Sequence, residues 1–457
     1  MSGKILMVMV VITVSWSVVA KEYELGEMVD DYGVCVRDFG AVGDGEADDT
    51  GPIQDALDSG APLVGVPYGY YKVNGSLRIG SDTRLVVHPR AVIQLVDNAG
   101  VDASIFLITN KDHEHGNTNL IIEGGIWDGN NPGNRRGEDA PDSYTGVAIN
   151  FINVNGLELR RMTVRDPESY YIRMGEVNFF RVEDIRFEAR HFRPNQDGIH
   201  ITGFSEDGLI RNVVAVDEGT TRDDLIALNA DDATQRAQNL GTKCGPIRRI
   251  RIENLSAQNC HSFVRFLSVW SPIEDIEIHN VQGGCRVSVL NFDACRGCRV
   301  QVFDSDDPGA SRGVGLIRNV TISGVRAYKS EERDSPLLLL ETRMECFVLR
   351  DFERIGEKDK SPAAPTLRIA HLVSDDIVLE GLRGSDITQL VNQSDAVDFH
   401  VSHLPMIYPE AQRYRLIANL EPNSQMLSHL RRLDHLAINR SDMSMWPEQV
   451  NDSCRTE

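Results

Sequence analysis

The sequence predicts an all-β fold built as a solenoid, in which the chain winds into stacked coils of short strands. Short strings of alternating apolar residues recur along most of the 457 residues, and most of them end in Gly, Asn, Asp or Ser, which form turns. Neighbouring strings mostly start about 20 to 40 residues apart, the length of one coil with its loops. The triplet Ile-Arg-Asn or Ile-Glu-Asn recurs at Ile210, Ile252 and Ile317, as expected for equivalent positions of successive coils. Convincing helices are absent between the strings, which disfavours α/β crossovers.

Each apolar string is interpreted as one or two short strands, and together the strings define the coils in order. They lie at residues 84–87, 120–126, 157–164, 179–187, 209–216, 247–255, 273–281, 316–325 and 377–382. Asn recurs near the strand ends, at Asn212, Asn254, Asn280 and Asn319. Because Asn tolerates the left-handed backbone of a sharp bend, these residues favour a repeated corner. Stacked coils would bury a continuous core that no single repeat could form.

Two segments outside the strings have helical patterns. Thr50 stands before Pro52 and the apolar residues Ile53 and Leu57, which places Thr as the cap and Pro just inside a helix. We expect this helix to cap the N-terminal end of the solenoid, which is predicted to occupy residues 21–410. Apolar residues at helical spacing over 425–436 predict a second helix. It would lie within a C-terminal cap and tail at 411–457.

Residues 1–20 are typical of a secretory signal peptide. Lys4 supplies a short basic start, residues 5–14 form an apolar stretch, and Val18 and Ala20 occupy the small-residue positions before a cleavage site. The apolar stretch is short for a bilayer span, which disfavours the alternative of an uncleaved membrane anchor. The sequence therefore predicts a secreted or periplasmic protein with no membrane segment after signal cleavage.

Composition restricts the classes of partner and cofactor. The formal net charge of −21 disfavours nucleic acid, whose phosphates need a basic surface, although basic residues gathered in a cleft could still bind an anionic sugar polymer. Eight cysteines are present, and Cys295 and Cys298 form a lone CxxC without a second pair at zinc spacing. We expect a disulfide or stacked buried thiols rather than zinc, and no cofactor. The sequence does not indicate an oligomeric state.

Two acidic motifs carry the candidate chemistry. Asn195 and Asp197 precede one apolar string, and Asp223 and Asp224 precede the next, with Asp223 standing 26 positions after Asp197. Equivalent points on neighbouring coils are about 4.8 Å apart, so we expect three carboxylates on one face, at the starts of two strands. Clustered carboxylates repel, which raises the pKa of at least one and keeps it protonated, as a general acid requires. The alternatives are a calcium site and solvated aspartates of a turn.

The N-terminal part of the chain resembles a known superfamily. The strings VRDFGAVGDGEADDTGPIQDAL at 36–57 and VPYGYYKVNGSLRIGSDTRLVVHPRAVIQL at 66–95 are similar to the signature and first coils of the pectate-lyase-like superfamily. GGIWDGN at 124–130 resembles the Gly-Gly-x-x-Asp-Gly string of polygalacturonases. The resemblance covers roughly residues 34–400 and implies a single right-handed parallel β-helix. It says little about chemistry, because lyases, hydrolases and tailspikes share this architecture.

The acidic motifs resemble those of the polygalacturonase family (glycoside hydrolase family 28), which run Asn-Thr-Asp, Asp-Asp, Gly-His-Gly and Arg-Ile-Lys. The first motif matches at 195–197, with Gln196 in the middle position, and the second at 223–224. The resemblance implies that Asp223 protonates the leaving oxygen. Asp197 and Asp224 would then hold and activate water, with inversion at the anomeric carbon.

The other two motifs of the family match only in part. His261 stands at the histidine of the third motif, with a cysteine and a serine in place of both glycines. It could tune the acid or bind a sugar hydroxyl, and the alternative is a histidine hydrogen-bonded at a turn. Arg286 matches the fourth motif, with Ser288 where the family has lysine. Because the basic pair grips the substrate carboxylate in the family, this change weakens the case for galacturonan itself.

Further residues near the motifs are candidate sugar contacts, as hydrogen-bonding groups or, for aromatic rings, as stacking platforms. The predicted substrate-binding set is Asn195, His200, Arg222, Arg265, Arg286, Tyr171 and Trp270. The predicted catalytic set is Asp197, Asp223, Asp224 and His261, and no metal site is predicted.

The sequence thus predicts a secreted glycoside hydrolase that cleaves an acidic polysaccharide or oligosaccharide, such as one containing uronic acids, with inversion. A second hypothesis is a polysaccharide lyase or epimerase on the same fold, in which the aspartates bind calcium and His261 or an arginine is the base. A third is a β-helix without turnover, as in tailspike-like or adhesive proteins, which the acidic cluster disfavours.

Overall fold

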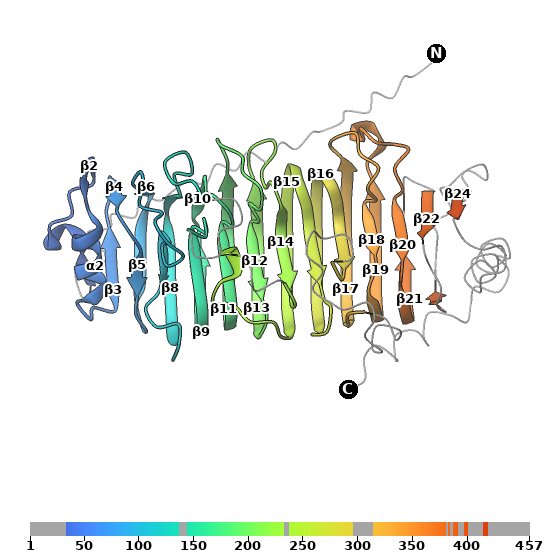
Figure 1. Cartoon of the computed structure of the whole chain (residues 1–457), viewed down its shortest axis with the longest axis horizontal. Coiled ribbons are helices and arrows are strands. Elements are labelled where there is room, and N and C mark those ends of the chain that lie inside the picture. Colours follow the sequence, from blue (N-terminus) through green and yellow to red (C-terminus); the bar gives the residue numbers. More distant parts are fainter. Residues whose placement is uncertain are drawn as a thin grey trace, which may run out of the picture.

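The computed structural model describes residues 33–136, 144–232, 237–295 and 314–380, together with 383, 387–391, 397–400 and 415–418. In this part of the chain the strands stack side by side along one long axis (Figure 1). They pair in parallel from the first to the last. The architecture is a parallel β-helix. The signal peptide expected at 1–20 and the helix expected at 425–436 lie outside the described residues.

The elements follow in chain order. The strands are β1 (Gly33–Cys35), β2 (Asp44–Asp48), β3 (Leu63–Val66), β4 (Tyr70–Val73), β5 (Leu77–Ile79), β6 (Arg84–Leu95), β7 (Ile108–Asn110), β8 (Asn117–Asp128), β9 (Ile149–Arg160), β10 (Thr163–Arg165), β11 (Ile172–Glu188), β12 (Ile199–Thr202), β13 (Ser205–Ala215), β14 (Asp224–Asn229), β15 (Ile247–Leu267), β16 (Ile273–Asp293), β17 (Ile317–Lys329), β18 (Leu338–Leu340), β19 (Arg343–Arg354), β20 (Leu367–Ala370), β21 (Val373–Glu380), β22 (Ile387–Val391), β23 (Val397–His400) and β24 (Arg415–Ala418). The helices are η1 (Val36–Phe39), α2 (Thr50–Asp58), η2 (Ala237–Asn239) and η4 (Gly356–Lys358).

The predicted apolar strings all fall within or overlap strands of the coil, from β6 to β21. Inward side chains form a continuous core. Ile172, Ile199 and Ile226 are in register on neighbouring strands and fully buried, and the rings of Phe266 and Phe292 stack at 4.4 Å. Burial of such side chains contributes about 1.5–3 kcal/mol each. Only stacked coils can supply it, because a single coil leaves both of its edges open.

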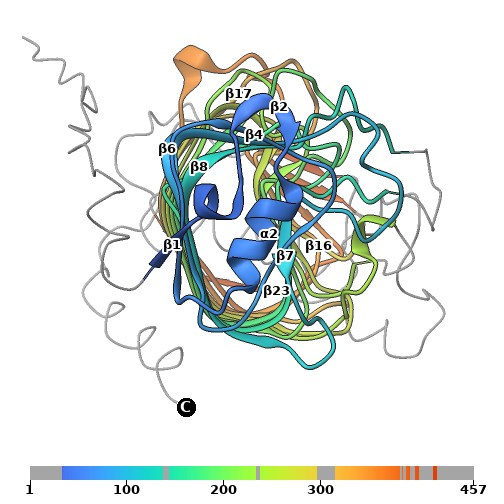
Figure 2. The same ribbon diagram turned by 90° about the vertical axis from the view of Figure 1, so that its left-hand side faces the viewer.

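The expected helix is present as α2, Thr50–Asp58, but its N-cap residue is Asp49 and not the predicted Thr50. Figure 2 shows α2 lying across the end of the coil, and its residues Ile53, Ala56 and Leu57 are buried in the main core. Pro52 stands in its first turn, where a missing amide hydrogen costs nothing. The helix therefore covers apolar side chains that the first coil would otherwise expose.

Asparagines line one corner of the coil, as predicted. Asn212, Asn254 and Asn280 all have left-handed backbone, with φ of 57°, 58° and 62°. Their side chains form a ladder, because the Nδ2 of Asn254 donates to Asn212 Oδ1 and that of Asn280 donates to Asn254 Oδ1, both at 2.8 Å. At the start of the ladder Asn212 donates to Asp184. This asparagine ladder satisfies amide groups at a bend that repeats on each coil.

The cysteines divide into two kinds. Cys260 and Cys285 are buried free thiols that stand opposite each other on β15 and β16, which confirms the expectation of stacked thiols. Cys295 is disulfide-bonded.

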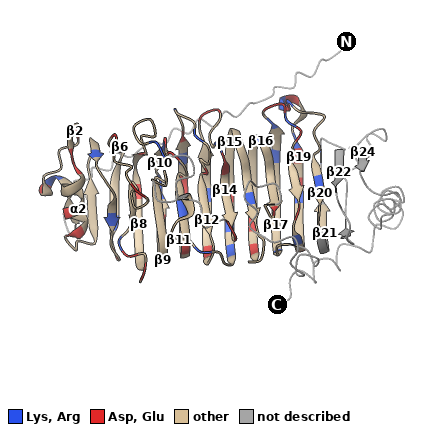
Figure 3. Cartoon of the chain, viewed as in Figure 1, with Lys and Arg blue, Asp and Glu red and all other residues tan. Residues whose placement is uncertain are grey.

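Charged residues are distributed over the strands and turns of successive coils (Figure 3). Glu274, for example, lies between Arg248 and Arg318 from the two neighbouring coils. Within the described ranges, no helix is long and apolar enough to cross a membrane.

Candidate active site

One ladder of short strands carries the acidic motifs. Its strands pair in the order β5, β7, β9, β11, β12, β14, β15, β16, β18, β20, β22 and β24. We call this the site ladder. Ile199 of β12 pairs with Ile226 of β14, so Asp197 and Asp224, two positions earlier on each strand, are equivalent.

The same register identifies a row of residues at the start of each strand. Asp224 pairs with Ser262, which pairs with Ser288. On earlier coils, Ile108, Ile149, Ile172 and Ile199 are in register, and the equivalent residues lie two positions before them. The strand-start row therefore runs Phe106, Val147, Tyr170, Asp197, Asp224, Ser262 and Ser288. The expectation that the acids stand side by side at strand starts is confirmed.

The aspartates differ in their access to solvent. Asp197 and Asp224 are buried, at 4% and 2% exposure, whereas the Asp223 side chain is 26% exposed. A backbone hydrogen bond of 2.9 Å from Gly198 to the Asp224 carbonyl joins the two motifs. Asp223 is thus the carboxyl of the three that a ligand can reach most easily.

His261 joins the cluster from the next coil. Its Nδ1 lies 3.4 Å from Asp223 Oδ1 and 3.7 Å from Asp224 Oδ1. On the other side of Asp223, the Nδ2 of Asn195 approaches Asp223 Oδ2 at 3.5 Å. The predicted catalytic residues are therefore together, with Asn195 placed to orient Asp223.

The environment favours the protonated forms of two of these carboxyls, Asp197 and Asp223. Burial, followed by the charges of Asp223 and Asp224, raises the pKa of Asp197 well above its usual range. Burial and the Asp224 charge also raise the pKa of Asp223, an effect that His261 opposes. Raised carboxyl pKa values are what a general acid and a competent base near neutral pH require.

His200 does not face the substrate side, contrary to the prediction. Its side chain is buried, and its ring stacks on Tyr170 with centroids 4.0 Å apart. Its Nδ1 lies 2.6 Å from Asp197 Oδ2, and burial lowers the pKa of His200 to about 4. The ring is therefore neutral at ordinary pH, and its contact with the Asp197 carboxyl makes it a positioning residue rather than a sugar contact.

Two of the predicted substrate-binding arginines are engaged inside the protein. Arg265 is buried against Asp293 and forms a bidentate ion pair with two contacts of 3.1 Å. Arg286, which is 3% exposed, donates to the carbonyl of Asn259 at 2.6 Å and to that of Thr221 at 2.7 Å. Both guanidinium groups are thus held by protein groups, although Arg286 also lines the pocket described below, and substrate binding by these two residues stays a prediction. Arg286 braces the segment that leads into Asp223.

The predicted aromatic platforms also lie elsewhere. Tyr171 is fully buried in the core against Phe187, because its position alternates inward from the strand-start row, so neither ring face is accessible. Trp270 is 48% exposed but follows the far end of β15. Ser262 and Leu267 bound the part of β15 that belongs to the site ladder, about 16 Å of strand. Trp270 is therefore not next to the aspartates.

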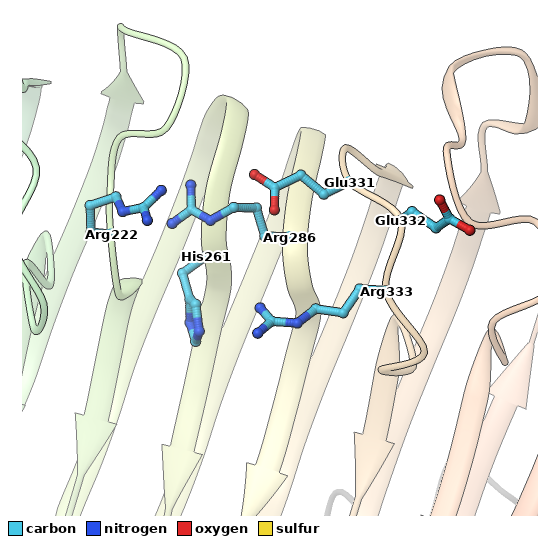
Figure 4. Close-up of a pocket in the computed structure, with 6 residues that line it drawn as sticks. All are labelled: Arg222, His261, Arg286, Glu331, Glu332 and Arg333. Carbon is cyan, nitrogen blue, oxygen red and sulfur yellow. The ribbon is translucent and has the colours of Figure 1, made fainter.

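A pocket opens on the later-coil side of the aspartates. Its volume is about 430 Å³, and it is lined by Arg222, His261, Arg286, Glu331, Glu332 and Arg333. In Figure 4, Arg222 and Arg286 point toward each other, Arg333 reaches in from the loop after β17, and Glu332 turns away. Within the part of the chain that the structure describes, neither Arg222 nor Arg333 forms an ion pair with a carboxylate. These two cations can therefore receive an anionic group of a ligand.

The sequence reasoning missed Arg333 and the two glutamates. A sequence signal exists, since the charged run EERD at 331–334 directly follows the end of a predicted coil. Whether such residues reach a site on earlier coils depends on the length of the loop that carries them.

The site also has a group that could hold a cation. The ligand atoms of Asp223, Asp224 and His261 all lie within 4.8 Å of one another. Calcium takes six to eight oxygen ligands, whereas this group offers two carboxylates and an imidazole nitrogen. The donor set fits calcium poorly.

Comparison with known proteins gives two kinds of relative. A profile of the family described as "Rhamnogalacturonase A/epimerase, pectate lyase-like" matches residues 33–130. A polygalacturonase of Persea americana is 27% identical over 279 residues, which cover 56% of each chain. The chain resembles the pectate-lyase-like superfamily.

Other relatives are appendage and surface proteins. The preneck appendage protein of Bacillus phage PZA is 36% identical over 102 residues, 22% of this chain and 12% of that protein. The crystal structure of PfbA, a surface adhesin of Streptococcus pneumoniae, aligns with a TM-score of 0.58 at 18% identity, over 78% of this chain and 86% of that one. The chain thus spans between 12% and 56% of the length of these two curated relatives. The similarity to the superfamily supports the fold, whereas the chemistry has to be inferred from the residues of the site.

Proposed function

We propose that this protein is an exported glycoside hydrolase that cleaves an acidic polysaccharide with inversion. The observation that carries the proposal is the adjacency of Asp197 and Asp224 in the strand-start row, with Asp223 beside them. The likeness to a polygalacturonase over about half of the chain supports a carbohydrate substrate. The composition of residues 1–20 supports export.

In the proposed hydrolysis, the three carboxyls have different catalytic roles. Asp223 is the most accessible of the three carboxyls, and its raised pKa favours the protonated form, so in this proposal it protonates the leaving oxygen. Asp197 and Asp224 lie deeper, where they hold a water and accept its proton as it attacks the anomeric carbon from the opposite face. His200 keeps Asp197 in place through the 2.6 Å contact.

An acidic substrate follows from the pocket beside Asp223. Arg222 and Arg333 are the cations that can contact a carboxylate or sulfate group there, and charge-assisted bonds to such groups are about twice as strong as neutral ones. The net charge of −21 would otherwise repel an acidic polymer, so a local cationic pocket is required. These arginines take the place of the lysine that the fourth motif lacks.

A lyase or epimerase is the second candidate, because Asp223, Asp224 and His261 could ligate a cation. It is less well supported, since calcium prefers oxygen ligands throughout. The likeness to an adhesin concerns the fold and gives no role to a buried acidic cluster, which is costly to maintain without a function.

The test is a screen of the purified protein against acidic plant and algal polysaccharides, with product mass and the anomer of the first product measured by NMR. We expect new reducing ends, saturated products and inverted anomeric configuration. An absorbance rise from unsaturated products that is lost on chelation would establish the lyase instead. Absence of reducing ends from every polymer in the screen would contradict hydrolysis.

A further inference from the structure

The two flanks of the aspartates differ in whether they are covered. On the later-coil side, the His261 side chain is 31% exposed and borders the pocket. On the earlier-coil side, the strand-start row continues with Tyr170, Val147 and Phe106, and all three are buried in an apolar cluster outside the main core. A sugar chain that ran along the row would meet open space on one side only.

The cover is the segment that follows β14. After Asp232 the chain returns at η2, and residues 238–242 fold back over strands of earlier coils; we call residues 238–242 the strap. Asn239 is fully buried and accepts a hydrogen bond of 3.1 Å from the Tyr170 hydroxyl. The strap therefore lies directly over the residue that precedes Asp197 in the row.

Further contacts hold the strap against two coils. Arg173 of β11 donates to the carbonyl of Gln238, and Gly241 lies against Ile152 of β9, close enough that a Cβ would be 3.4 Å from its Cδ1. The next residue, Thr242, donates back to the Asn239 carbonyl at 2.7 Å. These contacts order the strap as a fixed wall.

The floor beneath the strap is polar but inaccessible. Asn150, Arg173 and His200 occupy one outward-facing column of the site ladder, and each is at most 1% exposed. Arg173 Nε donates to Asn150 Oδ1 at 2.8 Å, and His200 contacts Asp197. In an open groove, residues of this kind would be available for sugar hydroxyls.

We propose that the strap makes the enzyme act on chain ends. This inference rests on the proposed hydrolase function. The terminal part of the substrate chain lies over Asp197 and Asp224 and stops against the strap, while the rest extends over His261, Arg222 and Arg333. An internal stretch of polymer cannot bind, because it would have to continue through Tyr170 and Asn239.

The experiment uses a polymer that the full chain cleaves, and measures viscosity and reducing ends together. We expect viscosity to fall only slowly as bonds are cut, and one short product to accumulate from the first time points. A rapid collapse of viscosity with a ladder of intermediate products would overturn the inference while leaving the hydrolase intact. Absence of reducing ends from all polymers would instead refute the proposed function.

A variant in which three glycines replace residues 238–242 tests whether the strap is the reason that the enzyme acts on chain ends. We expect its viscosity loss per bond cut to rise several-fold, because internal stretches can now enter. Asn280→Ala, which removes one bond of the asparagine ladder, is the matched control and should keep the wild-type product pattern. An unchanged pattern in a folded strap variant would contradict the assigned role of the strap. If that variant does not fold, the wild-type product pattern still decides the question.

Discussion

The asparagine ladder and the strand-start row run across the same coils. The residue type repeats along the ladder, but it changes along the row. In the ladder, Asn212, Asn254 and Asn280 share one residue type, one backbone conformation and one hydrogen-bonding pattern. In the row, the residue type changes from apolar to acidic to hydroxyl within a few coils, although the backbone register is continuous. Where one residue type repeats at equivalent positions, its side chains stabilise the stacking of the coils. Where the residue type changes from coil to coil, the residues form the candidate site.

The energetic consequences of the two regions are opposite. The ladder pairs neutral amides that would otherwise lack partners, which stabilises the fold. Burial and mutual repulsion raise the pKa values of Asp197 in the row and of Asp223 beside it, which costs stability when they ionise. Substitutions in the two regions should therefore change different measurements.

The largest effect among these comparisons is expected for the cationic pocket. The double substitution Arg222→Ala with Arg333→Ala should raise KM for an acidic polymer by about 10- to 100-fold, since charge-assisted contacts contribute roughly 1.5–3 kcal/mol. The kcat should change far less, because the carboxyls stay in place. The kinetics would be measured on the acidic polymer and on a neutralised ester of it, and the rise in KM should appear on the acidic polymer. An equal loss on both polymers would contradict an anion-binding role.

A smaller effect is expected for the buried histidine. His200→Gln should lower kcat by roughly tenfold, because a misplaced base loses part of the usual 10²- to 10⁴-fold contribution. The Asp197 carboxyl also loses its 2.6 Å contact with the ring, so the limb of the pH profile that reports the ionisation of Asp197 should move. A purely structural role would lower stability without moving that limb.

The stability of the acidic cluster should depend on pH with a definite sign. The folded-state pKa of Asp223 is raised, so its contribution is full at low pH and is lost as pH rises through the folded pKa. Asp223→Asn should therefore be more stable than wild type at pH 8, by about 1 kcal/mol or a few degrees of Tm. The difference should vanish in acid, and calorimetry at two pH values checks it.

The smallest effect on activity is expected in the ladder. Asn254→Ala removes two ladder hydrogen bonds, so it should cost about 1–3 kcal/mol of unfolding free energy and should leave kcat and KM unchanged. Chemical denaturation together with the activity assay measures both. A change in kcat would show that the two regions are coupled.

The sequence predicts the repeated features well and the interruptions only in part. The long strands β15 and β16 alternate in burial over much of their first halves, so their apolar strings are visible. The spacing of the two acidic motifs likewise predicts their adjacency, because they are one coil apart. The corner asparagines were predictable because one residue type recurs at one position.

The side chains around the acids were harder to predict. Every residue of β12 and β14 is buried, so no alternation reveals which face of His200 or its neighbours is covered. That cover comes from the strap and from Tyr170, and its position depends on how a loop folds back. Arg333 likewise enters the pocket because the loop that carries it folds back. Loop paths across coils are tertiary features that no local pattern encodes.

The central claim is that adjacent coils bring one protonated and two ionisable carboxyls to a single bond. The most direct test compares reducing-end release by wild type, Asp223→Asn and the control Asp184→Asn, which alters an acid of the asparagine ladder. We expect a loss of about 10²- to 10⁴-fold for Asp223→Asn, with unchanged folding, and wild-type release for Asp184→Asn. Full activity of folded Asp223→Asn would contradict it.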